Sequence, residues 1–172
     1  ASVGSATVSL DTGGTGAIID GGDAGTDGIT AKNIELIADS GIAVGAGVDA
    51  LLELDAENLA ATTVSGDINL EDTTGGVTVT AVGSTTGIKL TGTSQTNDNI
   101  SLTATGGSLT IIAAIQNSQE GDITLAATGI NSDILIGDAA TSANLRTSAA
   151  SGTASSLSIT ADDSILFGIN SY

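Results

Sequence analysis

The residues with the clearest potential for chemistry are carboxylates, and the densest group of them lies in a glycine-rich stretch. Asp20, Asp23 and Asp27 occur there close together, with glycine on several sides. Calcium takes several oxygen ligands, which loops of this kind can supply. The spacing fits neither the EF-hand loop nor the glycine–aspartate nonapeptide repeat. We therefore consider two readings, a calcium site at these three residues or an acidic loop that protrudes into solvent.

A second carboxylate group has a different spacing. Glu53, Asp55 and Glu57 alternate with other residues, so in a strand their side chains would point to one side. Asp72, brought in from a neighbouring part of the fold, could complete a second calcium site. Enzymes that cleave polysaccharides also use clustered carboxylates. Such enzymes tend to line their grooves with aromatic side chains, and this chain has only one Phe and one Tyr. A solvated acidic face is the simpler interpretation.

The overall composition excludes several classes of function. The chain has no His and no Cys, so the usual pairs of nucleophile and base are missing and we do not expect an enzyme. Its 20 acidic and three basic residues give a net charge of −17. That charge argues against nucleic acid as a partner and against docking on anionic lipid. No apolar run is long enough for membrane insertion.

One short pattern recurs along the chain and predicts the elements that would position these groups. An aliphatic residue, a polar one and a second aliphatic one form a minimal half-buried strand. The recurrence of such strands at similar spacings indicates a stacked repeat. The triplets are Ile34–Leu36, Ile68–Leu70, Val77–Val79, Ile88–Leu90, Ile100–Leu102, Leu109–Ile111, Ile123–Leu125, Ile134–Ile136 and Leu157–Ile159, in which the middle residue of Ile134–Ile136 is itself Leu.

The spacing of the triplets predicts an all-β fold, a right-handed parallel β-helix or solenoid. Pairing alternate triplets gives two strands per coil, with seven or eight coils of roughly 20–25 residues. Corners would fall at glycine-containing dipeptides such as Gly75-Gly76 and Gly121-Asp122. The scarcity of aromatic residues and the absence of proline suit a narrow stack of aliphatic layers. Residues 1–172 would form a single domain, one unit of a tandem or end-to-end array.

One segment is ambiguous between helix and strand. Asp49 to Ala61 is rich in Ala, Leu and Glu, which favours a short helix. Leu52-Glu53-Leu54 within it alternates as a strand does. Because repeats surround this segment, we predict a strand followed by a loop.

The polar residues of the strands suggest two kinds of outward ladder. Thr78-Val79-Thr80 and Ser101-Leu102-Thr103 would place hydroxyl groups in ranks, which could bind ice or a crystalline polymer, although solvated β-forming residues are the simpler explanation. Asparagines could stack in turns or in internal ladders and satisfy buried polar groups. The candidates are Asn33, Asn69, Asn97, Asn99, Asn117 and Asn131.

Both ends of the chain continue the repeat. Strand-like segments lie near each end, with Val8 and Leu10 in one and Ile165 and Phe167 in the other. A β-helix needs covers over its end coils unless something stacks on them. We expect copies of the protein to associate through these four residues.

The repeats resemble those of very large bacterial surface exoproteins of the filamentous-haemagglutinin-like type. The segments that carry the resemblance are Gly16–Gly22, Ile29–Ala38, Gly41–Gly45, Leu59–Leu70 and Gly75–Val79. The resemblance implies a right-handed β-helical shaft, export across a Gram-negative envelope and an extracellular or cell-surface location. No functional residues carry over, because the repeats of this family share no catalytic set.

The sequence therefore predicts a structural shaft or filament subunit of a cell-surface or extracellular fibre. Its main partners would be copies of itself. The alternative is an adhesin module that grips a glycan on a host or neighbouring cell through its face rich in Thr and Asp. Calcium is the one cofactor that the sequence suggests.

Overall fold

The computed structural model describes residues 6–21, 28–43, 51–93, 96–137, 143–147 and 155–168. All regular structure in these residues is β-strand. The strands are β1 (Thr7–Asp11), β2 (Ile29–Ile37), β3 (Leu52–Thr63), β4 (Ile68–Asp72), β5 (Val77–Val79), β6 (Ala81–Val82), β7 (Thr85–Thr86), β8 (Ile88–Leu90), β9 (Ile100–Ala104), β10 (Leu109–Ile111), β11 (Ile115–Asn117), β12 (Ile123–Ala127), β13 (Ile134–Ile136), β14 (Leu145–Thr147), β15 (Leu157–Ala161) and β16 (Ile165–Phe167).

Every predicted triplet lies in a strand, which confirms the all-β prediction. In β4, β9 and β10, for example, the aliphatic residues are buried and the polar residue between them is half-buried. The alternation follows from the two-residue period of a strand, which sends successive side chains to opposite faces. One face therefore carries mainly aliphatic side chains, and burying it drives the packing of the sheet.

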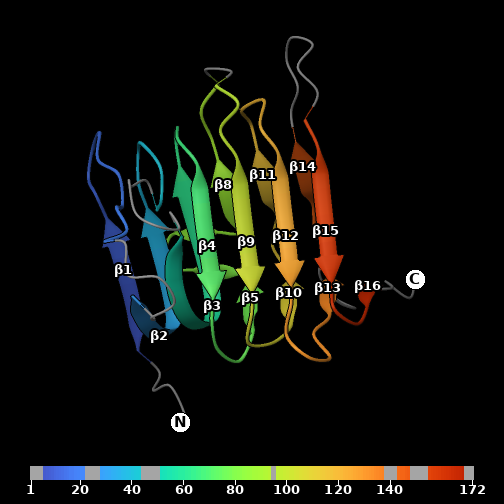
Figure 1. The fold of residues 1–172 in the computed structure, drawn as a ribbon. Coiled ribbons are helices and arrows are strands. Elements are labelled where there is room, and N and C mark those ends of the chain that lie inside the picture. The colour runs from blue at the N-terminus through green and yellow to red at the C-terminus, as the bar shows by residue number, and fades with distance from the viewer. Residues whose placement is uncertain are drawn as a thin grey trace.

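The strands stack in three parallel ladders (Figure 1). The first contains β4, β9, β12 and β15 together with the start of β3. The second contains β1, β2, the middle of β3, β5, β10, β13 and β16. The third contains the end of β3, β8, β11 and β14. We call one circuit of the chain through the three ladders a passage. From β4 to β14, each passage adds one strand to each ladder.

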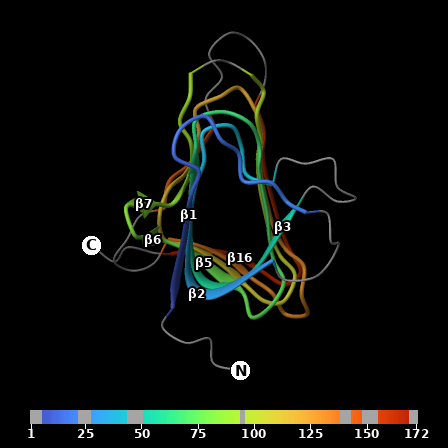
Figure 2. The same ribbon diagram turned by 90° about the vertical axis from the view of Figure 1, so that its left-hand side faces the viewer.

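The three ladders belong to one sheet of fourteen strands. Because β3 pairs with β4, β5 and β8 in turn, it links all three ladders. The sheet curls through 295° and nearly closes on itself. Figure 2, turned by 90°, shows the passages superimposed around a cross-section with three sides. The aliphatic face of every ladder points into this cross-section and forms one core.

The predicted pairing of strands is wrong in part. Ile68 pairs with Ile100 and not with Ile88, and Val77 pairs with Leu109 and not with Ile100. The cause is a third strand in each passage, so the prediction of two strands per coil is wrong. The steps from Ile68 to Ile100 and from Ile123 to Leu157 take 32 and 34 residues, whereas the step from Ile100 to Ile123 takes 23, within the predicted range. The third strands β11 and β14 each end on a polar residue at an inward position, so they do not match the aliphatic triplet pattern.

The ambiguous segment is a strand from Leu52 onward, as predicted, but the loop predicted after it is wrong, because the strand continues through Ala61 to Thr63. Its helix-forming composition loses to pairing on both sides, since β3 bonds to β2 along one edge and to β4, β5 and β8 along the other. Leu54, Ala56 and Leu59 are buried in the core. Tertiary contacts of this extent override a weak intrinsic preference.

Side-chain oxygens at the corners bind the backbone of the next passage. The Asp67 Oδ1 accepts from the Asn99 N–H (2.6 Å), and the Asn99 Oδ1 accepts from the Asp122 N–H (2.9 Å). The Asp122 Oδ1 in turn accepts from the Ser156 N–H (2.7 Å). We call this series the corner ladder. It satisfies backbone donors where the strands are interrupted, and every link runs in the same direction along the stack.

The aliphatic columns should carry most of the stability. Leu102, in the middle of β9, is fully buried. Truncation in Leu102→Ala leaves a cavity between two layers, and we expect a loss of about 2–5 kcal/mol in the free energy of unfolding. Denaturant unfolding measures this loss. The matched control is Ser101→Ala on the outward face of the same strand, which should change stability by less than about 0.5 kcal/mol. Equal losses in the two variants would contradict this packing.

Candidate functional site

The predicted self-association residues lie at the two ends of the ladders. Val8 and Leu10 are in β1, whose only described pairing is with β2. Ile165 and Phe167 are in β16, at the other end of the same ladder. Phe167 is 69% exposed, Ile165 41% and Leu10 37%, whereas the core residues in the middle of the ladder are fully buried. The structure thus places apolar side chains at both ends, aliphatic at the β1 end and both aliphatic and aromatic at the β16 end.

The proposed calcium loop lies mainly outside the described residues. Asp20 is buried at 8% exposure, while Asp23 and Asp27 fall in the stretch that the structure does not describe, so this site stays a prediction. The second set, Glu53, Asp55 and Glu57 with Asp72, is wrong as a metal site. Within the described residues, no three acidic side chains come close enough together to hold a metal ion.

One carboxylate missed in the sequence is the centre of a hydrogen-bond cluster. Glu35 in β2 is only 5% exposed. Its Oε2 accepts from the Ser9 hydroxyl (2.7 Å). Its Oε1 accepts from the Ser84 N–H (2.8 Å), the Ser84 hydroxyl (3.0 Å) and the Thr85 N–H (3.0 Å). The Ser9 hydrogen bond, helped by those from Ser84 and Thr85 and opposed by burial, lowers the pKa of Glu35 to about 2.

The donors on one side of this cluster come from the β6–β7 hairpin. This hairpin is the one antiparallel pair among the described strands, and Figure 2 shows it on the outside of the sheet. The hairpin follows β5 in the chain and extends across β3, so that its turn contacts Glu35 in β2. Gly83 has φ +58°, and a Cβ there would collide with the Glu35 carboxylate. The Gly83-Ser84 dipeptide was the sequence signal that could have identified the hairpin, since such a dipeptide is typical of two-residue hairpin turns.

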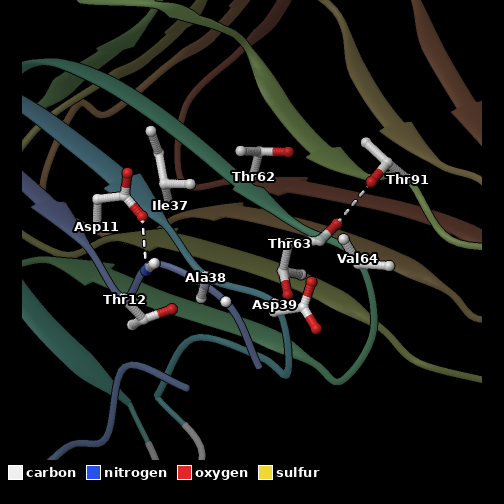
Figure 3. A pocket seen from close by; sticks show the side chains of 11 residues that line it. Asp11, Thr12, Ile37, Ala38, Asp39, Thr62, Thr63, Val64 and Thr91 are labelled. Carbon is white, nitrogen blue, oxygen red and sulfur yellow. Dashed lines mark hydrogen bonds between the residues drawn. The ribbon is translucent and has the colours of Figure 1, made fainter. Parts of the chain in front are cut away.

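A hollow of about 330 Å³ lies at the corner after the third ladder, towards the β1 end (Figure 3). The side chains of Asp11 and Asp39 reach it from successive passages of the chain. The lining residues are Asp11, Thr12, Gly13, Gly14, Ile37, Ala38, Asp39, Thr62, Thr63, Val64 and Thr91.

The polar groups of this hollow are engaged with the backbone. The Asp11 carboxylate accepts from the Gly13 N–H (2.8 Å). The Thr63 hydroxyl donates to the Ser65 carbonyl oxygen (2.8 Å) and accepts from the Gly41 N–H (3.0 Å). These hydroxyl and carboxylate groups shape the corner, and the hollow contains no pair of nucleophile and base.

The outward faces of the ladders carry the predicted polar ranks only in part, because Ala126 interrupts the column of Thr103 and Leu135 ends that of Thr78 and Thr110. Ser101, Thr124 and Ser158 form one column in the first ladder, and Thr103 and Thr160 lie in the next column along the strands. This face has no charged side chain on β9, β12 or β15.

The prediction of asparagine ladders holds in part. In the second ladder Asn33 stacks on Asn58, which was not among the candidates. The Asn58 Nδ2 donates to the Asn33 Oδ1 (2.9 Å), and the Asn33 Nδ2 donates to the Thr7 hydroxyl (3.2 Å). Asn99 takes part in the corner ladder. Asn117 is fully buried and donates to the Asp98 carbonyl oxygen (2.7 Å). These hydrogen bonds join successive passages through polar side chains.

No family model, no curated protein and no solved structure matches this chain. In the part of the chain that the structure describes, no helix is both long and apolar enough to cross a membrane.

The Glu35 cluster predicts a dependence of stability on pH. Because folding lowers the Glu35 pKa from 4.5 to about 2, its contribution is fully present above pH 4.5 and is lost as the pH falls through 2. We expect Glu35→Gln to lower the free energy of unfolding by about 1–2 kcal/mol at pH 7. Denaturant unfolding between pH 7 and 2 should show the difference from the parent protein shrinking over this range.

Glu57→Gln is the matched control for this prediction. Glu57 pairs with Lys32 (2.8 Å), and both side chains are exposed, at 48% and 40%. Exposed ion pairs contribute little, so we expect a loss below about 0.5 kcal/mol at pH 7. A Glu35→Gln variant as stable as Glu57→Gln at neutral pH would show that the cluster does not hold the hairpin in place.

Proposed function

We propose that this chain is a segment of a right-handed parallel β-helix that works as a structural shaft or filament subunit and associates end to end. One observation carries the proposal. In the second ladder, seven strands from β1 to β16 stack in parallel, and aliphatic columns run through them to exposed ends. In this reading each passage of the chain is one coil, and each ladder is one side of the helix.

The mechanical role follows from the direction of the bonds. Backbone hydrogen bonds between parallel strands run along the stack, so a pull along the axis loads three ladders at once. Each hydrogen bond contributes about 0.5–1.5 kcal/mol net. The corner ladder adds links at the positions between strands. A shaft of this kind resists extension without any single strong bond.

The charge of the chain suits a shaft that stays separate from its neighbours. A net charge of −17 opposes lateral contact between shafts. Growth along the axis is favoured by comparison, since most of the exposed large apolar side chains lie at the ends.

The place of action in this proposal is the bacterial cell surface or the extracellular matrix, most readily in a Gram-negative organism. The support is the resemblance of the repeats to filamentous-haemagglutinin-like exoproteins. The parallel sheet is the kind of architecture that this resemblance implies. In the proposal the chain acts without catalysis.

A second function is favoured by one specific observation. The outward face of β9, β12 and β15 is uncharged and lined with hydroxyl groups, although the protein as a whole is strongly acidic. A neutral, repetitive glycan fits such a face, because its hydroxyl groups can exchange hydrogen bonds with Ser and Thr. Binding to a glycan array that disappears in Thr124→Lys would support this adhesin role.

Electron microscopy tests the structural role directly. Purified protein should form fibres whose averaged power spectrum has a meridional repeat of about 4.8 Å, the spacing of neighbouring strands. Images of the fibres with and without a calcium chelator also test the proposed site at Asp20, Asp23 and Asp27. Fibres that come apart when calcium is removed would indicate that bound calcium stabilises them. Discrete particles of uniform size under all conditions would contradict the filament role and favour the binding module.

A further inference from the structure

The second ladder has an open strand at each end. Within the described residues, β1 pairs on one side only, with β2, and β16 pairs on one side only, with β13. Each open edge presents backbone N–H and C=O groups that a further parallel strand could bond. Exposed edges of this kind are templates for pairing with another chain.

The columns of this ladder determine how a further strand would align. Val8 at one end and Phe167 at the other occupy the same inward column, which passes through Ile34, Leu59, Val79, Ile111 and Ile136. Thr7 and Leu166 likewise end one outward column. If the stack continues by one step, a second β1 places its Thr7 beside Leu166 and its Val8 beside Phe167.

The exposure of the end residues shows what such a step would bury. In the inward column the interior residues from Ile34 to Ile111 are fully buried, whereas Phe167 is 69% exposed. Leu157, at the end of the first ladder, is 45% exposed although its column partner Ile123 is fully buried. A further layer would give these end residues the packing that the interior already has, at roughly 25 cal/mol for each Å² buried.

Two series of corner bonds give the stack a direction. In both series, a side chain of one passage accepts from the backbone N–H of the next passage towards β16. Other corner bonds run the opposite way, since the Asp98 Oδ2 accepts from the Gly66 N–H of the preceding passage (2.8 Å). In the second series, the Asp133 Oδ1 accepts from the Ser164 N–H (3.0 Å), just as the Ser108 hydroxyl accepts from the Asp133 N–H (3.0 Å). Ser164 stands at the β16 end of this series, so its hydroxyl is placed to accept from one further passage.

We propose that the β16 edge of one molecule binds the β1 edge of a second copy, head to tail and in register, with Leu166 beside Thr7 and Phe167 beside Val8. This junction rests on the proposed filament function and assigns its contact. A head-to-tail contact repeats without closing and so builds a fibre. A slip by one residue would turn Phe167 from the inward to the outward column, so the apolar column specifies the register.

Charge should control the strength of the junction. Each copy carries a net charge of −17. Stacking therefore brings two strongly acidic molecules together, and their like charges repel. The screening length falls from about 10 Å at 0.1 M salt to about 3 Å at 1 M, so added salt should promote stacking.

Cysteine cross-linking tests the junction, because the natural chain has no Cys. The double variant Thr7→Cys/Leu166→Cys places two thiols on neighbouring parallel strands of different molecules. Their Cα atoms would be about 4.8 Å apart, within the range that a disulfide spans. Oxidation should give a series of covalent oligomers on a denaturing gel, and their yield should rise with NaCl. Both positions are outward, and circular dichroism checks that the variants fold.

Three control proteins define the geometry. Thr7→Cys/Leu135→Cys moves one thiol a layer deeper in the same column, beyond the reach of a disulfide, and should give about tenfold less cross-linking. Each single variant should give no covalent dimer, because a head-to-tail contact never places identical residues together. A Leu166→Cys dimer would overturn the proposal in favour of a two-fold contact.

The outcomes separate this junction from the broader function. If the parent protein forms fibres in electron microscopy but the double variant does not cross-link, the proposed junction is wrong and the filament role stands. If equal cross-linking occurs in the deeper control, the register is wrong. If the parent protein sediments as a monomer at 1 M NaCl and the double variant does not cross-link, both the junction and self-assembly are wrong.

Discussion

The fold depends on one constraint, the in-register stacking of parallel strands. Because side chains alternate along a strand, a shift of one residue would move every aliphatic column from the core to the surface. Residues such as Ile34, Leu59 and Val79 can share a column only if each passage returns in the same register. The corners, the hairpin and the buried polar groups all lie where this regularity is interrupted, and each has hydrogen bonds that restore the alignment.

The interruptions show how a nearly uniform sequence builds distinct structural features. Where β5 leads into β8, the chain inserts the β6–β7 hairpin, which returns to Glu35 and ties together passages that are not adjacent. Where an aliphatic residue is missing at the end of β11, Asn117 occupies the inward position and bonds the corner. These polar groups provide specific alignment, while the aliphatic columns provide most of the driving force.

Much of the fold could be predicted from the sequence, and the reasons for the failures are physical. The triplets identified nine strands because two buried aliphatic residues around a polar one leave few alternatives. The strand pairing was partly wrong because β11 and β14 carry Asn117 and Thr147 at inward positions, so periodicity in aliphatic residues cannot find them. The end residues were predicted from their position in the repeat. The Glu35 cluster was missed because its donors come from a hairpin distant in sequence, which no local pattern relates to β2.

The central claim is that one continuous set of columns runs through the molecule, and a distance between two column positions tests it most directly. Thr7 and Leu135 lie five strand spacings apart in the second ladder. Spin labels on cysteines at these two positions, measured by pulsed electron paramagnetic resonance in magnetically diluted protein, should give a backbone separation of about 24 Å. A narrow distribution at that distance is the predicted result. A broad distribution, or a separation of less than about half that value, would contradict the stacked columns.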